Sequence, residues 1–372
     1  MISNGWKEVT LNDIAYLNYG KSLIADKRKK GSIPVYSSSG ITGQHDKALV
    51  NEEGIIIGRK GNVGSVFYSN RPFYCIDTAY YIKKSEITCD IKYLYYLLKT
   101  LRLDRLNEDS AVPGLNRDTA HTQTFFYPES IETQRRIADI LSALDDKIEL
   151  NRQTNATLED IAHAIFKEWF VDFNFPGATG ELVESELGMI PKGWRVGKLE
   201  EIITNYDRKR VPLSSREREN RKGIFPYYGA ASILDYVDDY LFDGVYLLMG
   251  EDGTVITEDG RPILQYVSGK FWVNNHTHVL QGKKPFSTEY VLLQLKNTSV
   301  KHIVTGAVQP KINQGNMNEL PVVIPGQFTL LSFQEIINPI FKDILVNEQE
   351  TSTLAKIRDA LLPKLMNGEI EV

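Results

Sequence analysis

The feature that most constrains the fold of this chain is a long stretch without glycine or proline, from Glu132 to Phe173. Its apolar residues recur at alternating steps of four and three residues, which is the spacing of a coiled-coil seam. At a rise of about 1.5 Å per residue, a helix of this length would span about 60 Å. We therefore predict a coiled-coil helix that separates two bodies. The predicted seam consists of Ile137, Leu141, Leu144, Ile148, Asn151, Asn155, Leu158, Ala162, Ile165 and Trp169.

The same spacing returns near the C-terminus, where Gln349–Leu354 (QETSTL) is similar to Gln153–Leu158 (QTNATL). Both seams are polar at their centres, and a buried polar pair fixes the alignment because a slip would place it against aliphatic partners. We predict that the two helices pack antiparallel with their polar layers facing. The alternative is that Asn151 and Asn155 begin a loop that breaks the first helix. The second seam consists of Ile337, Ile340, Ile344, Asn347, Thr351, Leu354, Arg358, Leu361 and Leu365.

The length of 372 residues suggests two or more domains. The sequence contains no apolar run long enough to cross a membrane, and its N-terminus lacks the pattern of a signal peptide. Cys75 and Cys89 lack the spacing of a metal site. We interpret them as buried or half-buried thiols of a protein in the reducing cytoplasm.

The net charge of −5 is unevenly distributed. Residues 1–131 contain 17 basic and 14 acidic side chains, a net +3, whereas residues 176–330 carry a net −1. The predicted helical segments 132–175 and 331–372 carry −4 and −3. A slightly basic first body permits DNA binding without demonstrating it.

The chain contains an internal repeat in which one body and one long helix occur twice. Most matched segments keep a similar order and spacing in both copies. The matched pairs are Gly5-Trp6 and Gly193-Trp194, Pro34–Tyr36 and Pro226–Tyr228, Gly54–Val63 and Gly244–Val255, Tyr93–Lys99 and Tyr290–Lys296, and Ser110–Asn116 and Gly306–Asn313.

The repeat predicts two similar α+β bodies joined by two long antiparallel coiled-coil helices, with a pseudo-twofold internal duplication. Strands are expected at residues 54–58, 66–68, 80–83, 245–249, 263–267 and 271–273, and helices at 91–103 and 288–295. The segment 174–193, rich in Gly, Pro and Glu, is the predicted linker. The predicted boundaries are 1–131 for the first body, 132–175 for the central helix, 176–330 for the second body and 331–372 for the C-terminal helix.

Three features carry a resemblance to a known family. They are Glu132–Arg152 (ETQRRIADILSALDDKIELNR), Phe166–Phe173 (FKEWFVDF) leading into Ser185–Trp194 (SELGMIPKGW), and the duplication itself. Together they resemble the specificity (S) subunit of type I restriction-modification systems. The resemblance implies that each body is a target-recognition domain that reads one half of a bipartite, asymmetric site in double-stranded DNA. It also implies that two methyltransferase (M) subunits dock on the helices and that motor-nuclease (R) subunits join this core.

The resemblance places adenine-N6 methylation and DNA cleavage on those partner subunits. The sequence agrees, because it lacks an Asn/Asp-Pro-Pro-aromatic run, a glycine-rich turn for S-adenosylmethionine, and a Walker A motif. His276 and His278 could form a metal pair, but the sequence shows no third ligand, so we interpret them as a surface or core pair. We predict no catalytic residue, metal or cofactor in this chain.

Reading DNA requires cations that contact phosphates and side chains that reach base edges. In the first body, four consecutive cations follow Asp26, and a turn punctuated by glycine follows the strand predicted at residues 54–58. We expect long side chains to project freely there. An ordinary polar turn explains most single positions equally well, although the turn at Arg59 favours function. The candidates are Lys27, Arg28, Lys29, Lys30, Ser38, Ser39, Arg59, Lys60, Asn62 and Arg117.

In the second body the equivalent turn carries Glu251 and Asp252, so the charge is inverted on the same predicted scaffold. A carboxylate can accept from the cytosine amino group, whereas Arg or Lys suits guanine. A carboxylate turned away from DNA, or toward a partner protein, would explain the inversion equally well. The basic stretch 216–222 is interleaved with glutamate and could be a mobile solvated loop. The candidates are Arg208, Lys209, Arg210, Tyr228, Glu251, Asp252, Thr254 and Lys311.

The acidic outer faces of the helices suit a basic surface of the methyltransferase subunits, although mere solvation explains any one carboxylate equally well. Two rival functions remain at this point. A free-standing methyltransferase or nuclease would bind S-adenosylmethionine or cleave DNA by itself, and a scaffold for two proteins would lack salt-dependent DNA affinity. The acidic residues are Asp139, Asp145, Asp146, Glu149, Glu159 and Asp160.

Overall fold

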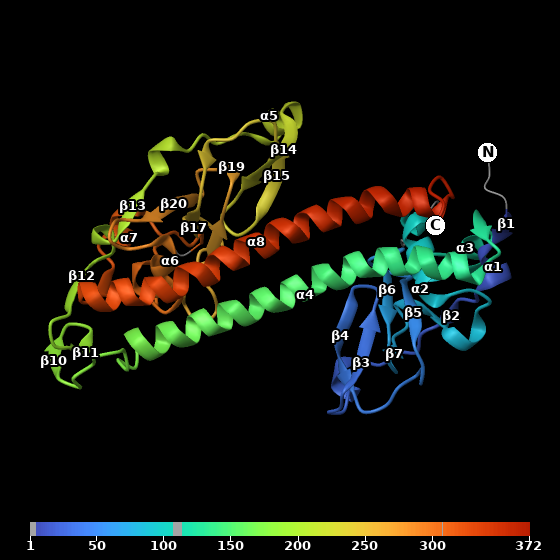
Figure 1. The fold of residues 1–372 in the computed structure, drawn as a ribbon, viewed down its shortest axis with the longest axis horizontal. Helices are drawn as coiled ribbons and strands as arrows, with labels where there is room; N and C mark the ends of the chain where they lie inside the picture. Colours follow the sequence, from blue (N-terminus) through green and yellow to red (C-terminus); the bar gives the residue numbers. More distant parts are fainter. Residues whose placement is uncertain (1–4, 107–113, 307) are drawn as a thin grey trace. The chain divides into compact units, whose positions relative to one another are not determined.

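The computed structural model describes residues 5–106, 114–306 and 308–372. The chain forms two compact units, of which unit 1 comprises Met1–Leu150 and Glu350–Val372, and unit 2 comprises Asn151–Gln349. Each unit contains one α+β body and one half of each long helix (Figure 1). This division assigns the helix halves to the bodies, whereas the four boundaries drawn from the sequence treat the helices as separate segments and stay a prediction.

Two helices of equal length run through both units. Helix α4 covers Ile131–Phe170 and helix α8 covers Gln327–Met366, and each contains 40 residues. Helix α4 continues without a break through Asn151 and Asn155. The alternative in which these two residues begin a loop is therefore wrong.

Within unit 2 the helix halves pack antiparallel through their polar layers. Asn151 Nδ2 donates to the carbonyl of Asn347 over 3.4 Å, and Asn155 Nδ2 donates to the carbonyl of Ile344 over 3.1 Å. Asn347 Nδ2 in turn donates to Asn155 Oδ1 over 2.8 Å. Because each amide finds a polar partner here and an aliphatic one after a slip, this layer fixes the alignment of the two helices.

Within unit 1 the helix halves are joined by ion pairs. Arg358 Nη1 lies 2.6 Å from Asp145 Oδ1, and Lys147 Nζ lies 3.1 Å from Glu350. Asp145 also accepts from the Tyr96 hydroxyl over 2.7 Å. Asp145 is therefore half-buried and used inside the chain, which differs from the solvated or partner-facing position expected from the sequence.

The seam residues named from the sequence are all buried or half-buried. In unit 1, Ile137 and Leu141 share one apolar core with Leu365. In unit 2, Trp169 shares another with Ile337. The heptad pattern omitted two further aromatic residues of α4 that are also buried, Phe166 and Phe170.

The body of unit 1 contains a four-stranded sheet of order β2-β8-β5-β6 and a three-stranded sheet of order β4-β3-β7. Strand β1 pairs with β9, and β3 runs parallel to β7. Strand β5 is buried along its whole length, which explains its unbroken apolar sequence. The strands are β1 (Trp6–Thr10), β2 (Asn18–Tyr19), β3 (Ile33–Ser37), β4 (Gly40–His45), β5 (Gly54–Gly58), β6 (Val66–Ser69), β7 (Tyr74–Cys75), β8 (Ala79–Lys83) and β9 (Thr124–Pro128).

The helices of this body are short. Asp90 caps the N-terminus of α2, and the left-handed conformation of Arg102 (φ 47°) follows its C-terminus. The helix expected to reach residue 103 therefore ends at Thr100. The helices are α1 (Leu11–Ile14), α2 (Ile91–Thr100) and α3 (Arg117–His121), with 3-10 turns η1 (Ala25–Lys27), η2 (Lys84–Glu86) and η3 (Leu103–Arg105).

The body of unit 2 repeats this plan, with sheets of order β13-β20-β17-β18 and β15-β14-β19-β16 and the pair β12-β21. The parallel pair β14-β19 corresponds to β3-β7. The strands are β12 (Arg195–Lys198), β13 (Ile203–Asn205), β14 (Lys222–Tyr228), β15 (Ile233–Val237), β16 (Phe242–Asp243), β17 (Tyr246–Gly250), β18 (Leu264–Val267), β19 (Lys270–Val273), β20 (Thr277–Gly282) and β21 (Pro321–Ile324), and the helices are η4 (Leu199–Glu201), η5 (Asp207–Lys209), α5 (Ser215–Asn220), α6 (Thr288–Lys296), η6 (Lys301–Ile303) and α7 (Gln314–Asn318).

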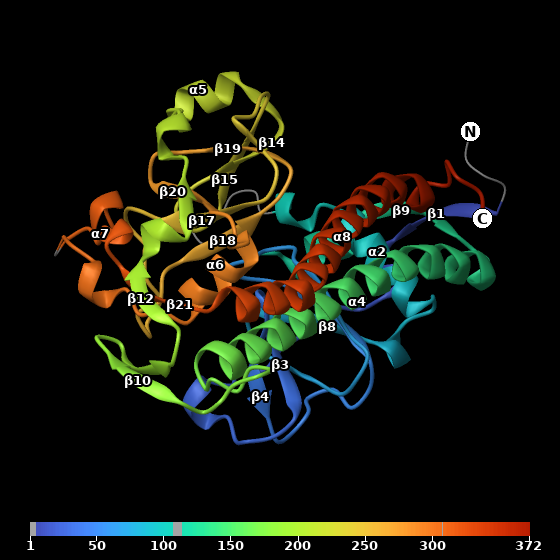
Figure 2. The same ribbon diagram turned by 60° about the vertical axis from the view of Figure 1, so that its left-hand side comes forward.

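Each strand and helix predicted within the two bodies therefore has a counterpart in the structure. The predicted linker is more ordered than expected, because it contains the antiparallel hairpin β10 (Leu182–Ser185) and β11 (Gly188–Pro191) (Figure 2). The repeat over Ser110–Asn116 lies partly outside the described residues. Its last residue, Asn116, caps α3 as Asn313 caps α7.

Cys75 and Cys89 are buried and unpaired, as the sequence predicts. Burial raises the pKa of both thiols to about 12. Among the residues that the structure describes, no helix has the length and apolar character needed to cross a membrane.

Candidate nucleic-acid interface

The turns after β5 and β17 share one backbone scaffold. The amide groups of Arg59 and Lys60 both donate to the carbonyl of Thr78, over 2.9 and 3.0 Å. In unit 2 the amide groups of Glu251 and Asp252 both donate to the carbonyl of His276, over 2.9 and 3.4 Å. Arg59 and Glu251 therefore occupy equivalent positions, as the internal repeat predicts.

A second set of bonds extends the equivalence to the neighbouring strands. The Tyr80 hydroxyl donates to the carbonyl of Leu115 over 3.0 Å, and His278 Nε2 lies 2.8 Å from the carbonyl of Ile312. Burial raises the pKa of Tyr80 to about 12, so the hydroxyl stays a donor at neutral pH. Tyr80 and His278 thus fill the same place below the turn.

In unit 1 the Arg59 guanidinium lies against aromatic rings. Its Cζ is 4.9 Å from the centroid of Tyr19 and 5.8 Å from that of Tyr80, and its Nη1 donates to the carbonyl of Asp77 over 3.3 Å. Arg59 is half-buried, so its side chain does not project freely as expected from the glycine-rich turn. The rings instead fix the direction of its remaining N–H groups.

Arg117 lies on the same ring from another element. Its Cζ is 5.1 Å from the centroid of Tyr19 and 5.3 Å from that of Tyr16, and its Nη1 donates to the Tyr16 hydroxyl over 2.8 Å. Arg59 and Arg117 are thus brought together by Tyr19, although 58 residues separate them in the sequence.

The other candidates of unit 1 lie on separate loops. Asn62 Nδ2 donates to the Ser39 hydroxyl over 3.1 Å, which joins two of the predicted turns. Arg28 is half-buried because its Nη1 donates to the carbonyl of Thr42 over 2.5 Å. Ser38 is buried, whereas the exposed candidates are Lys27, Lys29, Lys30, Ser39, Lys60 and Asn62.

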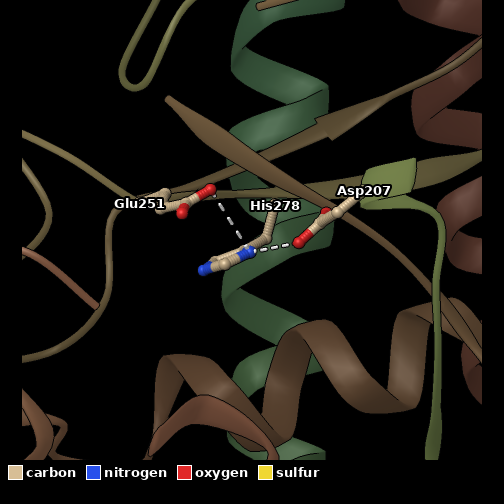
Figure 3. Close-up of side chains that lie close together, drawn as sticks. All are labelled: Asp207, Glu251 and His278. Carbon is tan, nitrogen blue, oxygen red and sulfur yellow. Dashed lines mark hydrogen bonds and ion pairs between the residues drawn. The ribbon is translucent and has the colours of Figure 1, made fainter. Parts of the chain in front are cut away.

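In unit 2 the equivalent place holds a network of charges (Figure 3). His278 Nδ1 lies 2.6 Å from Asp207 Oδ2 and 3.8 Å from Glu251 Oε2. Arg210 Nη1 contacts Glu251 Oε2 over 2.6 Å, and its Nη2 lies 3.6 Å from Asp207 Oδ2. Glu251 is therefore turned inward and neutralised by Arg210, which favours the reading in which this carboxylate faces away from DNA.

Both ring nitrogens of His278 have a partner within unit 2. A carbonyl oxygen can only accept, so Nε2 donates to Ile312, and Nδ1 faces the carboxylate of Asp207. Although burial opposes ionisation of Asp207, the hydrogen bond from His278 holds the pKa of this carboxyl below its ordinary value. The network therefore joins two carboxylates, those of Asp207 and Glu251, to the guanidinium of Arg210 and the imidazole of His278.

Asp207, Glu251 and His278 lie close enough together to offer three ligand atoms to a metal ion. The pairing of His276 with His278 considered from the sequence is therefore not the one that the fold brings together, because Asp207 and Glu251 lie beside His278 instead. However, both nitrogens of His278 already bond within the protein, and Arg210 supplies the cation that the two carboxylates require. The arrangement is that of a buried ion network.

Three polar side chains surround the outer edge of this network. Lys311 Nζ lies 3.3 Å from Asp252 and 3.7 Å from Glu251, and His276 Nδ1 lies 3.3 Å from Asp252. Lys311 and His276 keep about half of their side chains exposed, at 44% and 49%. Asp252 is thus paired as well, and Lys311 is an accessible donor at this rim.

The remaining candidates of unit 2 are more scattered. Tyr228 packs edge-on against Phe271 in a small apolar core, and Lys209 lies over the Tyr206 ring. The stretch expected to be a mobile loop is the capped helix α5 and the start of β14, where Arg218 and Lys222 both pair with Asp235. The exposed candidates are Arg208, Lys209 and Thr254.

Three residues at the centre of these sites escaped the sequence reasoning, namely Tyr16, Tyr19 and Asp207. The repeat contained the signal for two of them. The offset of 188 residues from Trp6 to Trp194 also relates Tyr19 to Asp207. An aromatic residue and an aspartate at equivalent positions do not look alike, so the match was not visible by residue type.

Comparison with known proteins agrees with the duplication. A family model described as the type I restriction modification DNA specificity domain matches residues 3–160 and 191–357. The type I restriction enzyme MjaIX specificity subunit of Methanocaldococcus jannaschii is 32% identical over 303 residues, which cover 76% of this chain and 69% of that protein. The HindI specificity subunit of Haemophilus influenzae is 22% identical over 472 residues, covering 98% and 99%.

The fold is also found in a crystal structure. The type I restriction-modification system S subunit from M. genitalium superposes with a TM-score of 0.64 at 18% sequence identity, covering 98% of this chain and 96% of that one. The predicted class of two similar α+β domains with long helices is therefore confirmed.

Proposed function

Because the chain belongs to the family of type I restriction-modification DNA specificity domains, we propose that its two bodies read the two halves of a bipartite, asymmetric DNA site. In this proposal the chain is the non-catalytic specificity subunit, and adenine-N6 methylation and DNA cleavage reside on other subunits. The rival functions, a free-standing enzyme and a scaffold without DNA, have no comparable support.

The observation that carries the proposal is the exchange of side chains on one scaffold. The same backbone turn presents Arg59 against aromatic rings in unit 1 and Glu251 within an ion network in unit 2. A duplicated reader of a symmetric site would need the same groups in both copies. Two different sets of groups suit two different half-sites.

We propose further that two methyltransferase subunits dock on the helices and that motor-nuclease subunits join this core in the cytoplasm. The acidic helix faces support a basic docking surface. Asp145 and Glu159 are engaged within the chain by Arg358 and Lys296. The carboxylates proposed to face the partner are therefore Asp139, Asp146 and Asp160, which are exposed.

The decisive experiment is to map methyl-adenine genome-wide in a host that carries this chain and its partner subunits. We expect one bipartite motif whose two halves differ. Replacing residues 5–130 with the corresponding body of a relative should change one half of the motif and leave the other intact. A map without a sequence motif, or a swap that changes both halves, would contradict the proposal.

The helices also offer a test of how the distance between the halves is set. Inserting one heptad into both helices, after Gln153 and after Gln349, preserves the seam and adds about 10 Å, or about three base pairs of rise. The two halves of the motif should then stay the same while the spacer grows. An unchanged spacer would show that the helices do not set this distance.

A further inference from the structure

Four side chains of unit 1 form an alternating stack of rings and guanidinium groups, Tyr16, Arg117, Tyr19 and Arg59, which we call the tyrosine–arginine ladder. Each guanidinium lies 4.9 to 5.3 Å from the rings of the ladder beside it. Tyr19 is the only member with a guanidinium from each of two different elements on its ring. The relative position of the two arginines therefore depends on this ring.

Both ends of the ladder are anchored. Arg59 Nη1 donates to the carbonyl of Asp77, and Arg117 Nη1 donates to the Tyr16 hydroxyl. The Tyr16 ring lies 5.2 Å from His121, whose Nε2 accepts the amide hydrogen of Leu17 over 3.1 Å. Burial and the nearby charge of Arg117 lower the pKa of His121, which keeps that nitrogen an acceptor at neutral pH.

The ladder carries positive charge that the chain itself leaves largely uncompensated. Among the described residues, no carboxylate pairs with Arg59, and Arg117 has one contact of 3.5 Å with Asp118, whose side chain is 85% exposed. Tyr16 and Tyr19 are 45% and 47% exposed. Two like charges on one partly exposed ring create a site for an anionic partner.

In unit 2, a carboxylate takes the position that Tyr19 occupies in unit 1. Asp207, the counterpart of Tyr19, bonds His278 and lies near Arg210, so this arginine is neutralised within the protein. A tyrosine ring at this position contacts Arg59 and Arg117 without neutralising their charge, whereas the carboxylate of Asp207 lies near Arg210 and offsets its charge. The residue at this position therefore decides whether the neighbouring arginine rests on a ring or is paired with carboxylates.

We propose that Tyr19 is a positioning residue for DNA recognition by unit 1, which holds Arg59 and Arg117 as a pre-aligned pair whose free N–H groups bind acceptors on one half-site. This inference rests on the proposed function. A guanidinium fixed on a ring loses less conformational freedom on binding than a mobile one, and its planar fork matches the O6 and N7 acceptors of guanine.

The test uses the complete complex of this chain with its methyltransferase subunits and the site found by methylation mapping. Binding is measured for duplexes substituted at every position of both halves. Tyr19→Leu should weaken cognate binding about five- to thirtyfold, because two cation–π contacts are lost. The loss of base preference should be confined to the half read by unit 1, while Tyr19→Phe, which keeps the ring, should behave as the wild type.

Tyr240→Leu is the matched control, because it removes a tyrosine that lies under Lys270 in unit 2. It should leave the preference in the first half unchanged. If Tyr19→Leu does not fold, Arg59→Lys and Arg117→Lys replace it, since both keep the charge and lose the planar stack. They should relax the same positions.

The outcomes separate the inference from the function on which it rests. A specific wild-type complex whose preference survives Tyr19→Leu, or survives both lysine variants, would overturn the role of Tyr19 alone. An equal loss in both halves would indicate a purely structural role and also overturn it. A wild-type complex without any sequence preference would overturn the proposed function and this inference together.

Discussion

In unit 1 the arginine that follows β5 lies against two tyrosine rings, whereas in unit 2 the glutamate at the equivalent position is held by an arginine beside a buried histidine. The backbone hydrogen bonds at these two positions are equivalent, so the difference between Arg59 and Glu251 lies in the side chains around them. Duplicating a body thus copies its scaffold, and a few substitutions below the turn then reset which charges reach the surface.

The comparison also separates two kinds of energetic role. In unit 1 the cations rest on rings that tolerate their removal, because no buried charge is left behind. In unit 2 each member of the Asp207, Glu251, Arg210 and His278 network compensates another inside the protein. Substituting the ring-stacked arginines of unit 1 should therefore alter recognition. Substituting a member of the unit 2 network should mainly alter stability.

The largest expected effect is that of Asp207→Asn. It removes the charge of a buried carboxylate that bonds His278 Nδ1 and lies near Arg210, and should destabilise unit 2 by about 3–5 kcal/mol. Denaturant unfolding followed by tryptophan fluorescence suits the measurement, because Trp169, Trp194 and Trp272 lie in unit 2. Asp259→Asn, which removes an exposed partner of Arg261, is the control and should change stability little. Equal losses would refute the contrast.

The stability lost in Asp207→Asn should also depend on pH. The pKa of Asp207 is lowered on folding, so its contribution to stability is complete above the ordinary aspartate pKa and is lost as the pH falls through the folded value. The difference in unfolding free energy between wild type and Asp207→Asn should be full at pH 7 and shrink below about pH 4. A difference that is constant down to pH 3 would assign the loss to shape rather than charge.

The next effect concerns recognition. Arg59→Ala should reduce discrimination at one position of the half-site read by unit 1 by about 1–3 kcal/mol, as expected for an arginine that forks onto guanine. Glu251→Gln, at the equivalent position, should leave base preference unchanged because its carboxylate faces Arg210. Lys30→Ala is the control for charge alone, and it should weaken binding to all sequences and lower the salt dependence. A base preference unchanged by Arg59→Ala would disprove the assignment.

The smallest expected effect concerns the contacts between the two long helices, which are ion pairs in unit 1 and asparagine amides in unit 2. Asn155→Leu should cost about 1–2 kcal/mol because it leaves Asn347 Nδ2 without its side-chain acceptor. The double variant Asn155→Leu, Asn347→Leu should recover most of this loss, since two apolar groups can pack together. Thermal unfolding measures both. A double variant less stable than the single one would show that these amides do more than fix alignment.

The elements that the sequence predicted well were those with a periodic or repeated pattern. The heptad steps of Glu132–Phe173 predicted an unbroken helix, and the repeat of Gly54–Val63 predicted the equivalence of Arg59 and Glu251. The end of α2 was harder to predict, because the residue type at Arg102 does not indicate its left-handed conformation. The hairpin in the predicted linker was missed because its Gly and Pro content is also typical of loops.

The site was less predictable than the fold for a physical reason. Periodicity reports which residues share a face, and repeats report which backbones are alike, so the sequence alone determined the two bodies, the two helices and the family resemblance. Whether a charge is free depends on side chains that tertiary folding brings together, such as Tyr19 with Arg59 and Arg117, or Asp207 with His278 and Arg210. Only the tertiary structure decided that the arginines of unit 1 rest on tyrosine rings while the carboxylates of unit 2 are paired within the protein.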